Sequence, residues 1–130
     1  MAEPESVVID LPYDATAPAI ARTFVAEHGS GLSSDVMHDA ELLVSELVTN
    51  ALRHGDPDIT LQMSTHPPRL GVGVVDRGEA DSIAPRNPPP GQPDGRGLMI
   101  VDAIASAWGV HPIDPPPGKI VWFELGPIPS

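Results

Sequence analysis

The chain has 130 residues, of which 41% are hydrophobic and 19% charged, and its formal net charge is −11. A domain of this size buries about two-thirds of the surface of its unfolded chain, so one packed core is expected. The acidic excess argues against direct nucleic-acid binding, which depends on clustered lysine and arginine. With no cysteine in the sequence, disulfides, cysteine zinc sites and thiol catalysis are excluded.

The sequence also gives no sign of a membrane location. No apolar run reaches the roughly 18 residues that a membrane-spanning helix needs. The acidic segment 1–6 lacks the basic start of a secretion signal. We therefore expect a cytoplasmic protein without a membrane partner.

The first half of the chain predicts one strand and two helices. Residues 6–11 are apolar and rich in β-branched side chains, which is typical of a strand. Apolar positions recur at helical spacing over 15–28, and Gly29 is expected to end that helix. The clearest helix begins after Ser33 or Ser34, carries its apolar stripe through Leu43, Leu47 and Ala51, and ends at Gly55.

The second half predicts four strands and one helix. Strands are expected at 59–64 and 70–75, joined by a turn at 66–68. A loop rich in proline, glycine and aspartate follows and is predicted to form a lid over 77–95. A helix should open at Gly95 and end near Trp108 and Gly109. The last strands are expected at 110–113 and 119–125.

Two polar residues stand beside the apolar stripe of the second helix. Glu46 and Asn50 are four residues apart, so they share one helical face. A solvated polar face is the ordinary explanation of such a pair. Asparagine is nevertheless unfavourable in mid-helix, because its side chain competes for backbone hydrogen bonds. Such a local conflict is where a functional site is worth suspecting.

Two further segments suggest ligand contacts. Asp76 ends an apolar strand and Gly78 follows it, so a carboxylate could accept a bond from an exocyclic amine beside an open space. Asp and Gly also occur in plain turns. Gly95 and Gly97 stand where a helix begins, and the backbone N–H groups there can hold an anion. Neither a dinucleotide-binding fingerprint nor a P-loop is present.

The order of these segments resembles the ATPase superfamily of DNA gyrase, heat-shock chaperones, sensor histidine kinases and mismatch-repair proteins. Within it the chain is most similar to the anti-sigma-factor serine/threonine kinases and their actinobacterial relatives. The resemblance covers roughly residues 14–125. It rests on the segments SELVTNALRHG at 45–55, DRG at 76–78, GRGL at 95–98, WGV at 108–110 and GKIVWFEL at 118–125.

This resemblance implies one domain over 1–130 with an α/β fold. The expected architecture is a two-layer sandwich, in which a mixed, mostly antiparallel sheet of about five strands carries three helices on one face. The implied cofactors are ATP and Mg²⁺. Asn50 would coordinate the Mg²⁺, and Glu46 would be the general base that takes the proton from an incoming hydroxyl. Asp76 would pair with the adenine amino group, and Gly78 would let the ring lie flat.

The resemblance also assigns the phosphate contacts. The backbone of Gly95, Arg96, Gly97 and Leu98 would meet the phosphates, and Arg96 and His54 could neutralise their charge. Many relatives carry a threonine after the glycine that precedes the last strand, and it helps to bind adenine. This chain has Lys119 there. The lack of a hydroxyl predicts modest adenine affinity unless a water replaces it.

The implied activity is that of a serine/threonine protein kinase. It would phosphorylate an anti-sigma-factor antagonist and sequester a sigma factor, and Arg22 falls where relatives engage protein partners. Relatives often form homodimers. The alternative is a non-catalytic module in which ATP gates partner binding. A histidine kinase or a gyrase-like ATPase is disfavoured, because no segment remains for a dimerisation helix or a second domain.

Overall fold

The computed structural model describes residues 5–78 and 96–127. Within these residues it contains one five-stranded sheet and three helices. In chain order the elements are β1 (Glu5–Leu11), α1 (Ala17–His28), α2 (Ser34–His54), β2 (Ile59–His66), β3 (Arg69–Asp76), α3 (Arg96–Ile104), β4 (Ala107–Pro112) and β5 (Lys119–Leu125).

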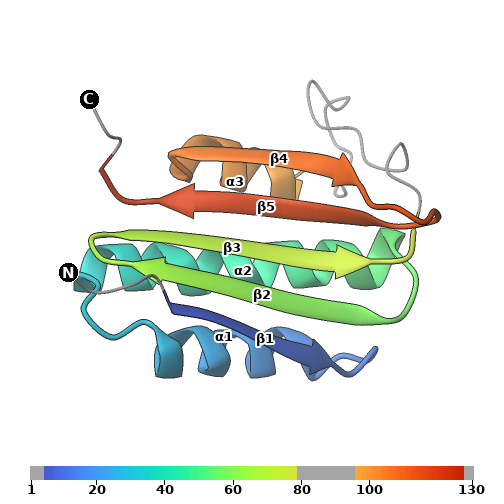
Figure 1. Ribbon diagram of the computed structural model, residues 1–130, viewed down its shortest axis with the longest axis horizontal. Coiled ribbons are helices and arrows are strands. Elements are labelled where there is room, and N and C mark those ends of the chain that lie inside the picture. The colour runs from blue at the N-terminus through green and yellow to red at the C-terminus, as the bar shows by residue number, and fades with distance from the viewer. Residues whose placement is uncertain (1–4, 79–95, 128–130) are drawn as a thin grey trace.

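The strands lie in the order β1-β2-β3-β5-β4, and each neighbouring pair is antiparallel. β2 and β3 form a tight hairpin around Pro67 and Pro68. After β3 the chain forms α3 and then β4, which lies at the edge of the sheet. The last strand, β5, lies between β4 and β3. The ends of α2 and β3 and the start of β5 consequently lie at the same end of the molecule (Figure 1).

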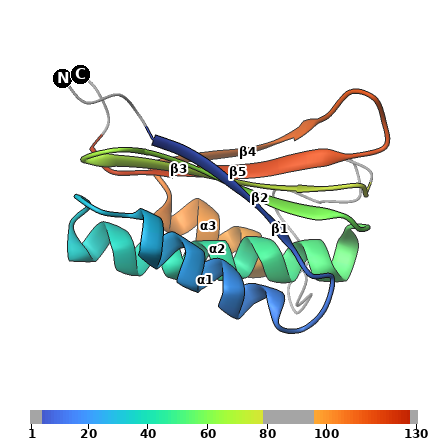
Figure 2. The same ribbon diagram turned by 60° about the horizontal axis from the view of Figure 1, so that its bottom comes forward.

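The three helices cover one face of the sheet (Figure 2). The alternation of β2 shows why: Ile59, Leu61 and Met63 are buried, whereas Gln62 and Ser64 between and after them are exposed. Successive side chains of a strand point to opposite faces, so the apolar set faces the helices. These side chains and the helical stripes form one core. The predicted two-layer α/β fold is confirmed, and all of its described pairings are antiparallel.

The helix α2 has the limits and the buried stripe that its sequence predicts. The hydroxyl of Ser33 accepts a hydrogen bond from the N–H of Val36 at 3.1 Å and so caps the first turn. Leu43, Leu47 and Ala51 are buried against the sheet side of the core. This helix is 21 residues long. It is therefore the longest scaffold element among the described residues.

α1 begins two residues later than predicted, at Ala17, because a turn at Asp14 precedes it. The Asp14 carboxylate accepts hydrogen bonds from the hydroxyl and the backbone N–H of Thr16. These two bonds, the hydroxyl bond above all, lower the pKa of Asp14. The turn takes up the residues that helical periodicity had assigned to the first turn of the helix.

The prediction that the third helix ends near Trp108 and Gly109 is wrong. α3 ends at Ile104, and the N–H of Ser106 already donates to the carbonyl of Glu124 at 2.8 Å. This bond starts the pairing of β4 with β5. Apolar periodicity over a few residues does not distinguish the end of a helix from the start of a strand.

Several strand limits also differ from those predicted. β4 occupies Ala107–Pro112 instead of 110–113, and the hairpin strands extend to Ile59–His66 and Arg69–Asp76. Pairing with neighbouring strands extends these strands beyond the apolar runs from which the sequence predicts them. In the described part of the chain, no helix is long and apolar enough to cross a membrane.

The packing of the core predicts that alanine substitution at two leucines of α2 lowers the free energy of unfolding by different amounts. Leu47 is 2% exposed, whereas Leu42 on the same helix is 37% exposed. We expect Leu47→Ala to lower the free energy of unfolding by about 2–5 kcal/mol, because it leaves a cavity. Leu42→Ala should change it by only about 0.5 kcal/mol. Urea unfolding of both variants measures the difference, and equal losses would contradict the described packing.

Candidate functional site

A buried ion pair joins β3 to β5 at the end of the sheet. Asp76 and Lys119 are opposite each other in the register, so both side chains point to the helix side. Lys119 Nζ lies 2.9 Å from Asp76 Oδ1, and the two side chains are 0% and 1% exposed, respectively. A charge removed from water must be paired to be tolerated. This pairing therefore fixes the ends of two neighbouring strands.

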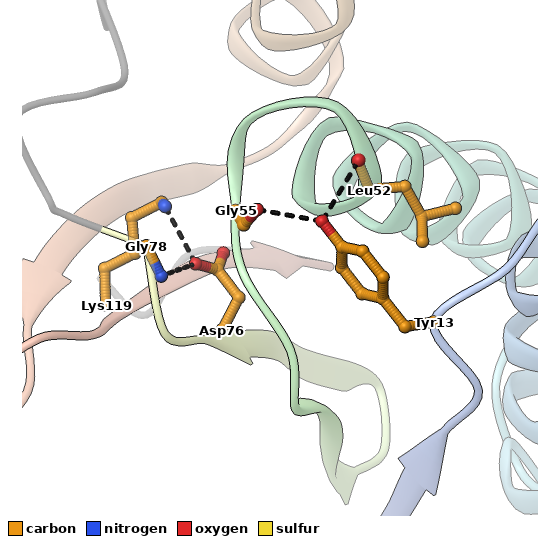
Figure 3. A network of polar contacts seen from close by, with 6 residues as sticks. All are labelled: Tyr13, Leu52, Gly55, Asp76, Gly78 and Lys119. Atoms are coloured by element: carbon orange, nitrogen blue, oxygen red, sulfur yellow. Dashed lines mark hydrogen bonds and ion pairs between the residues drawn. The ribbon is translucent and has the colours of Figure 1, made fainter.

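The same carboxylate also holds the residues that follow β3. The N–H of Gly78 donates to Asp76 Oδ1 at 2.7 Å, as Figure 3 shows. Both bonds to the carboxylate thus fall on Oδ1. Among the described residues, no donor is bonded to Oδ2. Oδ2 is therefore the oxygen of Asp76 that could accept a hydrogen bond from a ligand.

Two glycines allow the end of α2 to approach this pair. A Cβ atom on Gly55 would lie 2.5 Å from Cγ of Asp76, and one on Gly78 would lie 2.9 Å from both Lys119 Nζ and the Cα of Gly55. Such distances are far inside normal contact. Gly78 was predicted to make room for a flat ring. In the structure its missing side chain makes room for the lysine ammonium and for Gly55. The contact with a ring stays a prediction.

Tyr13 contacts the carboxyl-terminal end of α2. The hydroxyl of Tyr13 donates toward two carbonyl oxygens, those of Gly55 at 2.8 Å and Leu52 at 3.3 Å (Figure 3). The last carbonyls of a helix have no partner within the helix, and the single hydroxyl proton of Tyr13 is shared between that of Leu52 and the neighbouring one of the C-cap Gly55. This contact ties the segment between β1 and α1 to the same end of the molecule as Asp76.

Glu46, Asn50 and His54 follow one another at four-residue spacing along the last turns of α2. Asn50 is only 8% exposed, and neither of its amide atoms is among the buried side-chain atoms that lack a hydrogen-bond partner in the described residues. Glu46 and His54 are half-buried. An oxygen-ligated cation fits here, because Mg²⁺ prefers oxygen and takes few ligands from the protein.

The other predicted site residues are placed only in part. Gly95 lies outside the described residues. Arg96, Gly97 and Leu98 open α3, which packs against α2, but their side chains are also outside what the structure describes. Among the described residues, no group of three or more His, Cys, Asp or Glu side chains could hold a metal.

Arg22, the predicted partner contact, is exposed on α1 and donates to the hydroxyl of Ser45 on α2 at 2.6 Å. Its role toward a partner stays a prediction. Sequence reasoning missed the roles of Tyr13 and Lys119. For Lys119 a signal was present: it shares the inward face of its strand with Val121 and Phe123, and a charge on an apolar face needs a partner.

The ion pair predicts a large stability difference between variants. Lys119→Met leaves a buried carboxylate without its cation, so we expect unfolding to become easier by about 3–5 kcal/mol. Adding Asp76→Asn should restore most of this loss, because the amide keeps the acceptor for Gly78 and carries no charge. Urea unfolding at neutral pH provides the measurement.

A matched control lies on the same two strands. Arg69 and Glu124 form an ion pair at 3.5 Å, with side chains 42% and 44% exposed. Arg69→Met should therefore cost under about 1 kcal/mol. A loss in Lys119→Met no larger than in this control would contradict the structural role of the buried pair.

Comparison with known proteins agrees with this geometry. A search of curated proteins gives no match. The family model described as the histidine kinase-like ATPase domain matches residues 11–124. The match spans every described helix and includes the end of β3 and the whole Glu46–Asn50 segment. The chain belongs to the histidine kinase-like ATPase domain family, and with it to a class of ATP-binding domains.

Proposed function

We propose that this protein is an ATP-dependent serine/threonine kinase that phosphorylates an anti-sigma-factor antagonist and sequesters a sigma factor. The observation that carries the proposal is the position of Asn50, which is 8% exposed, one helical turn after Glu46 and beside an apolar stripe. Asparagine is unfavourable inside a helix, so a purely structural helix would have little reason to place it there.

In this proposal the amide oxygen of Asn50 is the protein ligand of Mg²⁺. The ion supplies neutralisation of the phosphate charge when it is bound. Glu46 lies on the same face of α2 and is half-buried, so it can accept the proton of a serine or threonine hydroxyl. Phosphoryl transfer depends mainly on positioning and charge neutralisation. A rigid helix that carries both groups four residues apart meets that need.

The proposal assigns the remaining nucleotide contacts to residues at and after the end of β3. Asp76 recognises the base, Gly78 gives the base room, and the backbone of Gly95, Arg96, Gly97 and Leu98 binds phosphate. His54 ends α2 with Arg53 beside it. The proposal assigns His54 to the phosphates. Arg22 contributes to partner binding from the surface of α1, on the side of α2 that carries Ser45.

Two variants of α2 separate nucleotide binding from transfer. Asn50→Ala should abolish Mg²⁺-ATP binding, because it removes the protein ligand of the cation. Glu46→Gln should keep the affinity but lower the transfer rate by about 10²–10⁴-fold, the usual contribution of one general base. Calorimetric titration measures the first effect and single-turnover phosphorylation the second.

The control for both is His38→Ala, an exposed position in α2 about 18 Å along the helix from Asn50. It should change neither quantity. Unaltered ATP affinity in Asn50→Ala would remove the basis of the proposed site.

The kinase activity itself is tested with radiolabelled ATP and the antagonist proteins encoded near the gene. We expect label on a serine or threonine of one antagonist and none with Glu46→Gln. Pull-down of a sigma factor with and without ATP tests the second half of the proposal. ATP-dependent capture without any labelled antagonist would instead indicate a module in which ATP only gates partner binding.

A further inference from the structure

The base-recognising carboxylate of the proposed site is already paired with a cation. Lys119 Nζ lies 2.9 Å from Asp76 Oδ1, and both side chains are buried. We propose that Lys119 determines base specificity, because its ammonium makes the site tolerant of purines with a 6-oxo group as well as a 6-amino group. This inference rests on the proposed function, in which Asp76 meets the base.

A lone carboxylate selects a 6-amino purine for two reasons. It accepts a hydrogen bond from the amino group, and its charge repels the lone pairs of a 6-oxo group. The second effect is the repulsive part of the discrimination. A site that offers only acceptors at this position therefore binds adenine and rejects hypoxanthine and guanine.

The buried lysine changes both effects. Its positive charge offsets that of Asp76, and solvent does little to screen a pair that is 0% and 1% exposed. The ammonium has three N–H donors, and Asp76 Oδ1 is its one hydrogen-bond acceptor among the described residues. The site thus presents unused donors beside the unused acceptor Oδ2.

A donor beside an acceptor matches the edge of either purine. Adenine donates from its 6-amino group and accepts at N1, whereas hypoxanthine and guanine accept at O6 and donate from N1. The same two protein groups can pair with either edge when the base shifts by one position. Because the carboxylate is buried, this contact requires the atoms that now cover Oδ2 to move aside as the nucleotide enters.

ATP and ITP are the sharpest probes, since their bases differ only at this edge. For the wild-type chain with Mg²⁺ we expect calorimetric dissociation constants within about fivefold of each other. Lys119→Thr should raise the preference for ATP to about tenfold or more, the value of one correct base-edge pairing. Lys119→Gln should move the ratio in the same direction, and it keeps a donor for Asp76 if the threonine variant does not fold.

The readout is the ratio of the two affinities, which a merely structural role would leave unchanged. Arg69→Thr, which breaks the exposed pair of the same strands, serves as the control and should not alter the ratio. A wild-type chain that already prefers ATP strongly, with the same ratio in both lysine variants, overturns this inference alone. Binding of neither triphosphate to the wild-type chain overturns the proposed function and the inference together.

Discussion

The Asp76 carboxylate is the point at which the sheet, the longest helix and the candidate site meet. It faces inward from the last residue of β3, pairs with Lys119 of β5 and accepts the N–H of Gly78. Two charges in an apolar interior are tolerable only when geometry brings them together, so the sheet register and the ion pair require each other. The close approach of Gly55 then sets where α2 ends relative to this pair.

α2 serves as both core and site because its two faces differ. Leu43, Leu47 and Ala51 bury one stripe, while Glu46 and Asn50 stand beside it on a helix whose first turn is capped by Ser33. At the other end of this helix, the carbonyls of Leu52 and of the C-cap Gly55 accept from Tyr13. A helix fixed at both ends and packed along its length holds polar groups in constant positions, as phosphoryl transfer requires.

Under the proposed function, the ion pair couples stability to base recognition. Removing Lys119 frees the carboxylate for a ligand but leaves a buried charge unpaired, whereas keeping it holds the sheet together and changes the edge that a base would meet. The sheet register places the carboxylate at the end of β3 and its cation opposite, on the neighbouring strand β5. The fold and the proposed specificity thus depend on the same pair of side chains.

The sequence by itself determined the element order, the limits and stripe of α2, the two-layer α/β class and the family, because these follow from local periodicity, capping and short motifs. The roles proposed for Glu46, Asn50 and Arg22 stay predictions. Only the tertiary structure decided where α3 ends, how far the strands extend, and that Lys119 faces Asp76. These depend on pairing between segments far apart in the chain. Local sequence patterns do not determine which residues of two distant strands pair with each other.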